Sequence, residues 1–167
     1  MLLRAPQQLT LPGVRWWPAR RLPNYDGAKP TEAALLDWFW DRYAQAWEAA
    51  AYNVRVGHGR PVLPSMPDEL KRDWRMSTQL RIDALLWKPD MLCVLEVKEY
   101  GDAEAFGQAY LYSLLLRRTY GVYGTIARAV LCYDVHPDLV KLYVEHGITL
   151  YVVQPLSPIA ARHAEGK

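Results

Sequence analysis

Two short apolar segments of the sequence carry charged residues in their interior. The segments are residues 81–87, which contain Asp83, and residues 92–98, which contain Glu96 and Lys98. If the intervening Pro89-Asp90 is the centre of a hairpin, facing positions sum to 179, so Asp83 lies opposite Glu96 with Cβ atoms about 4.5–5.5 Å apart. Two carboxylates at that separation repel unless a cation lies between them or one is protonated. Because side chains alternate along a strand, Lys98 shares a face with Glu96, which predicts a metal site with a lysine beside it.

Metal-assisted hydrolysis of a phosphodiester is the chemistry that this arrangement favours. Mg²⁺ prefers oxygen ligands, keeps several waters and needs only one or two protein carboxylates, and we expect Mn²⁺ to be able to substitute for it. The bound ion lowers the pKa of a water and polarises the phosphoryl group. Lys98 would orient the attacking water or stabilise the phosphorane, and the backbone carbonyl of Val97 is a further candidate metal ligand.

These residues resemble the PD-(D/E)XK nuclease superfamily, in which an Asp on one strand is followed, after a turn, by an apolar strand ending in Glu or Asp, any residue, and Lys. Here the pattern reads Asp83, then Glu96-Val97-Lys98, with Ile82 in place of the proline before the aspartate. The resemblance implies a restriction-endonuclease-like core, an α/β fold with a central mixed sheet flanked by helices. It also implies a Mg²⁺-dependent deoxyribonuclease.

Residues on the flanking helices extend the resemblance. Gln108 and Tyr112 are spaced i, i+4 after the Glu-x-Lys strand, as in the RecB-like and phage exonuclease types, where such a pair helps to position the nucleic-acid backbone. Archaeal Holliday junction resolvases are similar in placing a metal-supporting glutamate early in the first helix. Glu32 matches that position and Glu48 is the alternative, although an acid in a first turn also simply complements the helix dipole.

The pattern of apolar residues and turn signals predicts the elements that carry these residues. It predicts a helix over 30–51, strands over 52–56, 81–87 and 92–98, a long connection with a short helix at 68–75, a helix over 103–118, and a strand, helix and strand over 126–133, 136–145 and 148–153. We expect three regions: a basic N-terminal arm (1–29), the nuclease domain (30–156) and a flexible tail (157–167).

Composition fits a compact domain of 167 residues, 51% hydrophobic and 23% charged. No apolar stretch is long enough to cross a bilayer, and Arg4 and Pro6 interrupt any signal-peptide core. Cys93 and Cys132 both lie in apolar segments and fit small core residues. We therefore expect a cytoplasmic protein without contact with membranes.

Basic residues gather ahead of the hairpin, which favours DNA as the partner through contacts with its phosphates. The candidates for nucleic-acid binding are Arg15, Arg20, Arg21, Arg60, Lys71, Arg72, Arg75 and Arg81. Trp16-Trp17 could stack on bases or pack the arm onto the domain. The sequence leaves open whether the enzyme is an exonuclease, a junction resolvase or a restriction-type endonuclease, and whether it acts in repair, recombination or phage DNA processing. It also leaves open a homodimer or other homo-oligomer, and partner proteins. A catalytically silent DNA-binding module is the alternative from another class.

Overall fold

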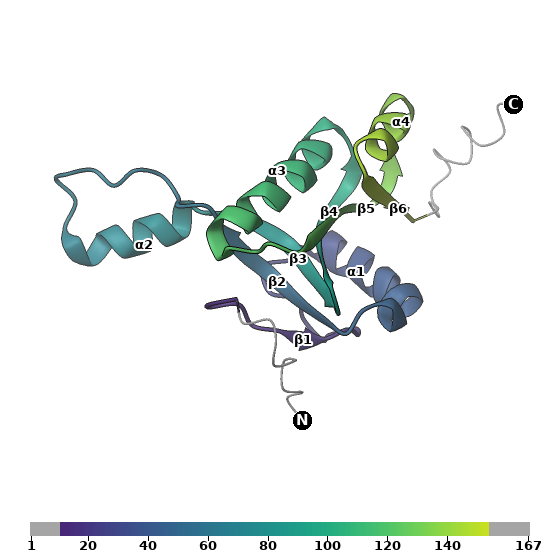
Figure 1. Ribbon diagram of the computed structural model, residues 1–167, viewed down its shortest axis with the longest axis horizontal. Helices are drawn as coiled ribbons and strands as arrows, with labels where there is room; N and C mark the ends of the chain where they lie inside the picture. The colour runs from purple at the N-terminus through teal and green to yellow at the C-terminus, as the bar shows by residue number, and fades with distance from the viewer. Residues whose placement is uncertain (1–10, 154–167) are drawn as a thin grey trace, which may run out of the picture.

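A computed structural model describes residues 11–153 of the chain, and the expected tail at 157–167 lies outside this range. A single mixed sheet of six strands is flanked by helices, as the sequence predicts (Figure 1). The elements are β1 (Trp17–Pro18), α1 (Pro30–Tyr43), the 3-10 turn η1 (Ala44–Ala46), β2 (Ala49–Val56), α2 (Asp68–Thr78), β3 (Leu80–Lys88), β4 (Met91–Gly101), α3 (Ala103–Tyr120), β5 (Thr125–Val135), α4 (Pro137–Glu145) and β6 (Ile148–Val152).

The strands follow one another across the sheet in sequence order. Strands β1 to β4 are antiparallel neighbours, whereas β4, β5 and β6 run parallel and are joined by the crossover helices α3 and α4. In the β3–β4 hairpin, Lys88 pairs with Met91 and Ala84 with Leu95, so the predicted register is confirmed over these pairs. Pro89 presets the first loop position and Asp90 takes a positive φ of 67° at the second.

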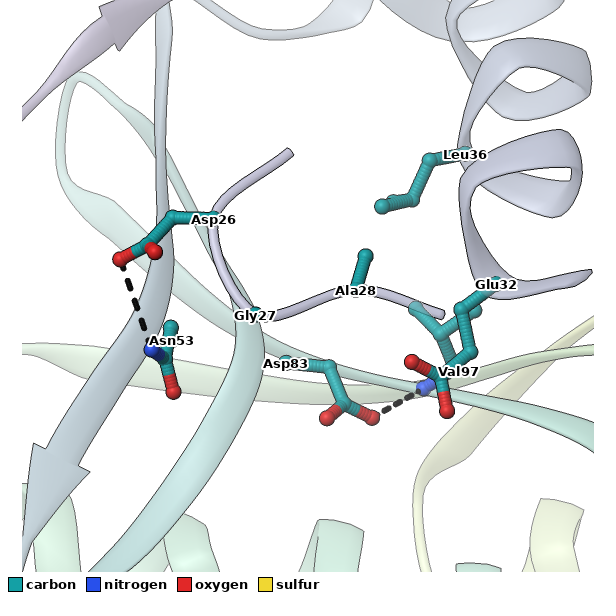
Figure 2. A pocket seen from close by; sticks show the side chains of 8 residues that line it. All are labelled: Asp26, Gly27, Ala28, Glu32, Leu36, Asn53, Asp83 and Val97. Atoms are coloured by element: carbon teal, nitrogen blue, oxygen red, sulfur yellow. Dashed lines mark hydrogen bonds between the residues drawn. The ribbon is translucent and has the colours of Figure 1, made fainter. Parts of the chain in front are cut away.

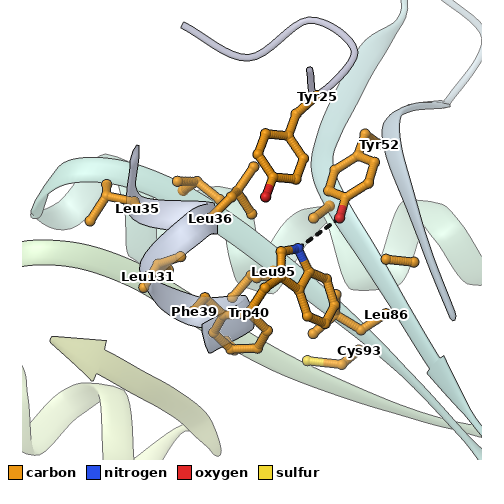
Figure 3. Close-up of a cluster of buried hydrophobic side chains, with 14 residues drawn as sticks. Tyr25, Leu35, Leu36, Phe39, Trp40, Tyr52, Leu86, Cys93, Leu95 and Leu131 are labelled. Carbon is orange, nitrogen blue, oxygen red and sulfur yellow. Dashed lines mark hydrogen bonds between the residues drawn. The ribbon is translucent and has the colours of Figure 1, made fainter. Parts of the chain in front are cut away.

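Helix α1 covers one face of the sheet through an aromatic and aliphatic core (Figure 3). Leu35 and Phe39 are fully buried there, and burying a side chain of that size contributes about 1.5–3 kcal/mol. The buried indole N–H of Trp40 donates to the Tyr52 hydroxyl over 2.8 Å, which satisfies the polar atom and fixes α1 against β2. This packing sets where the first turn of α1 meets the sheet.

Helices α3 and α4 cover the opposite face (Figure 1). Asp102 caps α3 by accepting a hydrogen bond from the Ala105 N–H over 3.0 Å, and Gly121, at a φ of 64°, ends the helix in the left-handed conformation. Only one residue separates β4 from α3, so the first turns of this helix lie beside the end of β4. This short connection brings the helix residues toward Glu96 and Lys98.

The predicted helix over 30–51 was wrong at its end. Helix α1 stops at Tyr43, and β2 already begins at Ala49 rather than at residue 52. Alanine has the highest helix propensity and is depleted in strands, so local propensity favours a helix at residues 49–51. Pairing of Ala49 and Ala50 with β3 decides the outcome, since it gives their buried backbone groups partners.

The segment before α1 packs onto the sheet. Trp17 and Pro18 form β1 and pair with β2, and the Trp17 ring contributes to the core on the α1 side. Trp16 packs against the core on the other face. Both tryptophans therefore serve packing, which was one of the two roles considered for them.

Candidate active site

Asp83 lies where strands β2 and β3 lose their regular alternation. It faces Asn53, because the neighbouring pairs are Tyr52 with Ala84 and Val54 with Ile82. Tyr52 and Ala84 pack on the α1 side, yet Val54 and Ile82 pack on the α3 side, although residues two apart in a regular strand share a face. Asn53 takes a left-handed φ of 54°, a conformation that asparagine tolerates better than most residues. The kink turns the Asp83 side chain toward β4.

The Asp83 carboxylate continues the β3–β4 ladder by means of its side chain. The last backbone pair is Ala84 with Leu95, and beyond it Asp83 Oδ2 accepts a hydrogen bond from the Val97 N–H over 2.8 Å (Figure 2). The N–H and C=O of one strand residue face the same neighbouring strand, so the Val97 carbonyl also faces β3. Burial raises the pKa of Asp83, opposed by the Val97 hydrogen bond and by the Lys98 charge.

Glu96 is buried on the adjacent strand, with a relative exposure of 1%. Its Oε1 has no hydrogen-bond partner among residues 11–153. Burial, and secondly the Asp83 charge, raises the pKa of Glu96 to about 9, with Lys98 acting in the opposite direction. A buried carboxylate oxygen without a partner is costly unless it is protonated or meets a cation. Asp83 and Glu96 thus lie close enough to affect each other's pKa, one residue beyond the last backbone pair of the hairpin.

Four residues of β4 and α3 lie on the Lys98 side of the site. Lys98 Nζ lies 3.8 Å from Glu104 Oε1, and the Gln108 amide donates to the same oxygen over 3.0 Å. The Oε1 of Gln108 is buried and has no hydrogen-bond partner in the described part of the chain. Burial, followed by the charges of Glu96, Asp83 and Glu104, raises the pKa of Tyr112 to about 12. Tyr112 therefore lies near the carboxylate pair, and Gln108 lies against Glu104, which faces Lys98.

Glu32 reaches the pair from the other side. It lines a small cavity of about 20 Å³ together with Asp83 and Val97 (Figure 2), which is room for a water-sized group. Its charge raises the pKa values of both Asp83 and Glu96. Glu32 also accepts from the Lys29 N–H over 2.9 Å, so it completes a capping box as well.

Glu48 belongs to a different part of the sheet. Its backbone N–H donates to the carbonyl of Trp87, next to the hairpin turn and four residues along β3 from Asp83. Four residues of strand span about 13 Å. The geometry thus places Glu32 rather than Glu48 beside the carboxylate pair.

The oxygen donors of this site fit a small divalent cation. Within residues 11–153, Glu96 Oε1 has no hydrogen-bond partner, and Asp83 and Val97 both line the small cavity. Residues 11–153 contain no compact group of three or more His, Cys, Asp and Glu side chains suited to a metal. Two neighbouring carboxylates are a ligand set that Mg²⁺ can use, because this ion fills most of its coordination shell with water and needs only one or two carboxylates.

Sequence reasoning missed three polar residues at the site. The Asn53 amide donates to Asp26 over 3.4 Å, and both line the cavity (Figure 2). Glu104 lies between Lys98 and Gln108. One of the three could have been found from the sequence, because Asn53 interrupts the apolar β2 segment. In the β2–β3 register, Asn53 faces Asp83. Asp26 and Glu104 come from a loop and a helix end, where acids are common.

The basic residues proposed for nucleic-acid binding have different surroundings. Arg21 makes ion pairs with Asp37 and Asp41, at 2.8 and 3.4 Å, and Arg15 stacks on the Trp17 ring at 4.0 Å. Arg20 and Arg60 are exposed, and Arg81 donates to Asn53 over 3.4 Å at the site. Lys71, Arg72 and Arg75 share one side of α2 and line a common hollow.

No protein-family model matches the sequence, and no curated protein matches it. A solved repair endonuclease from Pyrococcus abyssi is similar in structure, with 16% sequence identity and a TM-score of 0.45. The similarity covers 77% of this chain and 49% of that one, so the chain spans about half the length of that protein. A likeness of this size supports no conclusion about activity.

Between residues 11 and 153, no helix has both the length and the apolar character of a membrane span.

Proposed function

We propose that this chain is a Mg²⁺-dependent deoxyribonuclease that hydrolyses DNA phosphodiester bonds. The observation that carries the proposal is the buried Glu96 oxygen, which has no hydrogen-bond partner within residues 11–153, next to a second buried carboxylate on Asp83. Without a cation, one of the two acids must stay protonated, as the pKa of Glu96 at about 9 indicates. A bound cation explains why both are retained.

Asp83, Glu96 and the Val97 carbonyl would hold the ion, and Glu32 would support it from α1. When bound, Mg²⁺ supplies a lowered water pKa and a counter-charge for the phosphoryl oxygens. Lys98 would donate a hydrogen bond to the attacking water or to a non-bridging oxygen. Its ion pair with Glu104 over 3.8 Å limits where the ammonium can lie.

Gln108 and Tyr112 would act on the substrate rather than on the ion. The Gln108 amide is oriented by Glu104, and the raised pKa of Tyr112 keeps its hydroxyl protonated and able to donate at neutral pH. Both groups suit hydrogen bonds to the phosphate backbone next to the scissile bond. Loss of either group would misplace the substrate, which reduces activity without abolishing it.

The basic residues and the site chemistry together favour DNA as the substrate. Repair, recombination and phage DNA processing are all compatible with the site, as are exonuclease, junction resolvase and restriction-type activities. The opposing hypothesis of a silent DNA-binding module has less support. Asp83, Glu96 and Lys98, which carry the proposed chemistry, are all present and lie together.

Cleavage assays on three shapes of DNA test the proposal. Supercoiled plasmid, linear duplex and a branched junction are each incubated with Mg²⁺, with Mn²⁺ and with EDTA. We expect cleavage with either ion and none with EDTA. The preferred shape then separates attack at ends, at internal sites and at branch points. Binding of all three DNAs with no cleavage under Mg²⁺ would instead support the silent module.

A further inference from the structure

Residues 57–79, here called the α2 arm, project from the sheet beyond the ends of β2 and β3 (Figure 1). No residue of α2 is buried, so the arm does not contribute to the hydrophobic core. Its two ends leave the sheet at Val56 and Leu80, each three residues from Asn53 or Asp83. Three strand residues span about 10 Å. The arm therefore begins close to the candidate active site.

The base of the arm is held in place by hydrogen bonds. Gly57 N–H donates to the Thr119 hydroxyl of α3 over 2.8 Å, and the Gln79 amide donates to the Gly57 carbonyl over 2.7 Å. Gly59 passes so close to α2 that a Cβ there would lie 2.4 Å from the Arg75 carbonyl oxygen. These contacts give the arm a defined position relative to the site.

Charge is divided between two sides of α2. Lys71, Arg72 and Arg75 follow the helical spacing of one side and line an open hollow of about 460 Å³, together with His58, Asp68, Met76 and Gln79. Asp68 lies at the start of the same side, where it pairs with Lys71. The remaining acids of the helix, Glu69 and Asp73, are spaced i, i+4 on another side. The hollow thus presents mostly hydrogen-bond donors and positive charge.

We propose that this hollow binds the phosphate backbone of double-stranded DNA next to the bond that is cut. The inference rests on the proposed function, because it identifies the substrate as a duplex on that side of the site. Proteins that hold single strands stack bases on aromatic rings. The indole of the arm, Trp74, instead gives its N–H to the Pro61 carbonyl over 3.2 Å and does not line the hollow. Donors without a stacking platform suit phosphates of a duplex.

The test measures binding by full-length protein carrying Glu96→Gln, so that cleavage does not interfere. The arm variant is Lys71→Gln, Arg72→Gln, Arg75→Gln. Its matched control is Arg42→Gln, Arg118→Gln, Lys141→Gln, which removes the same charge from exposed positions on other helices. Fluorescence anisotropy is recorded with a duplex of about 20 base pairs and with one of its strands, between about 50 and 200 mM salt.

We expect the arm variant to lose affinity for the duplex by about tenfold or more. The slope of log affinity against log salt should fall by nearly one unit for each lost phosphate contact. The control should bind like its parent, and the single strand should be affected less than the duplex. An unchanged slope, an equal loss on the single strand, or an equal loss in the control would overturn the inference.

Glycine substitutions test whether the position of the arm matters. Gly59→Ala and Gly57→Ala both strain a positive φ, but only at Gly59 does the new Cβ meet neighbouring atoms. We expect Gly59→Ala to weaken duplex binding more than Gly57→Ala does. Equal effects of the two changes would overturn the idea that the contact with α2 presents the hollow to DNA.

The outcomes for the arm and for the chemistry are separate. If wild-type protein cleaves DNA but the arm variant keeps the parental slope, the arm inference fails and the proposed hydrolysis stands. If the slope falls as expected but wild-type protein cleaves no DNA with Mg²⁺, the hydrolysis fails and the duplex contact stands. A change in sedimentation with an unchanged slope would make the arm a surface for self-association and overturn the inference.

Discussion

Asp83 Oδ2 accepts a hydrogen bond from the backbone N–H of Val97 at the point where the β3–β4 backbone ladder ends. The Asp83 carboxylate therefore has a structural partner in the backbone of β4, and it also interacts with the Glu96 side chain at the site. These two interactions make the structural and the chemical roles of Asp83 separable by substitution.

We predict that Asp83→Asn and Asp83→Ala both lose cleavage but differ in stability. Asparagine retains an acceptor for the Val97 N–H, whereas alanine leaves a buried donor without a partner, which costs about 1–3 kcal/mol. Chemical denaturation of both variants gives the difference, and hydrogen exchange at the Val97 amide should speed up only in Asp83→Ala. Equal stability with equal exchange would contradict the role of this hydrogen bond.

A second prediction concerns the pH dependence of stability without metal. The pKa of Glu96 is raised from 4.5 to about 9 in the folded state, so the folded protein holds more protons than the unfolded chain between these values. Its contribution to stability is complete below about pH 4.5 and is lost as the pH rises toward 9. The slope is at most about 1.4 kcal/mol per pH unit for one proton.

Glu96→Gln should flatten this slope and be more stable than wild type at pH 8 in EDTA. Urea unfolding from pH 5 to 9 measures the free energy of unfolding of each protein. The control is Glu99→Gln, a change at an exposed position on the same strand. Raised pKa of Asp83 acts in the same direction, so some slope should persist. If the free energy of unfolding of Glu96→Gln depends on pH as steeply as that of wild type, Glu96 is not the group that takes up a proton on folding.

Glu32 and Glu48 offer a matched pair of glutamate to glutamine changes. Glutamine can replace glutamate in a capping box, so Glu32→Gln keeps the helix start and removes only the charge near Asp83. We expect it to raise the Mg²⁺ concentration needed for half-maximal cleavage, with little change in melting temperature. Glu48→Gln, near the hairpin turn, should match wild type. A loss of stability in Glu32→Gln with an unchanged Mg²⁺ requirement would leave Glu32 with its capping role alone.

Gln108→Ala and Tyr112→Phe should lower cleavage less than changes at Asp83 or Glu96. Both residues are proposed to position the substrate, so a loss of about tenfold to a hundredfold is expected for each. Single-turnover kinetics at a series of Mg²⁺ concentrations make the measurement, and the apparent affinity for Mg²⁺ should not change. Complete loss of activity at Gln108, together with lost metal binding, would place its amide oxygen among the ligands.

The hairpin was predictable because its signals are local. Two apolar segments of similar length meet at Pro89-Asp90, and the strand period of two then fixes which residues face each other. The same pattern identified Asp83 and Glu96, since charge inside a buried strand stands out. The parallel pairing of β5 and β6 followed from the strand, helix and strand order.

Features that depend on tertiary contacts were not predictable in this way. The left-handed Asn53 and the kink at Asp83 arise from the pairing of two strands distant in sequence. The end of α1 was misplaced because the alanines at 49–51 favour a helix locally, and pairing with β3 overrides that preference. Asp26 and Glu104 reach the site through the packing of a loop and of α3, which no spacing in the sequence records.

Single-turnover cleavage by wild type, Glu96→Gln and Glu99→Gln, each with Mg²⁺ and with EDTA, tests the central claim most directly. Both variants change the same chemical group on β4, but only Glu96 is buried beside Asp83. We predict that wild type and Glu99→Gln cleave DNA at similar rates with Mg²⁺ and not at all with EDTA, and that Glu96→Gln does not exceed the rate without protein. Cleavage by Glu96→Gln at the wild-type rate would contradict the claim that this carboxylate pair is the active site.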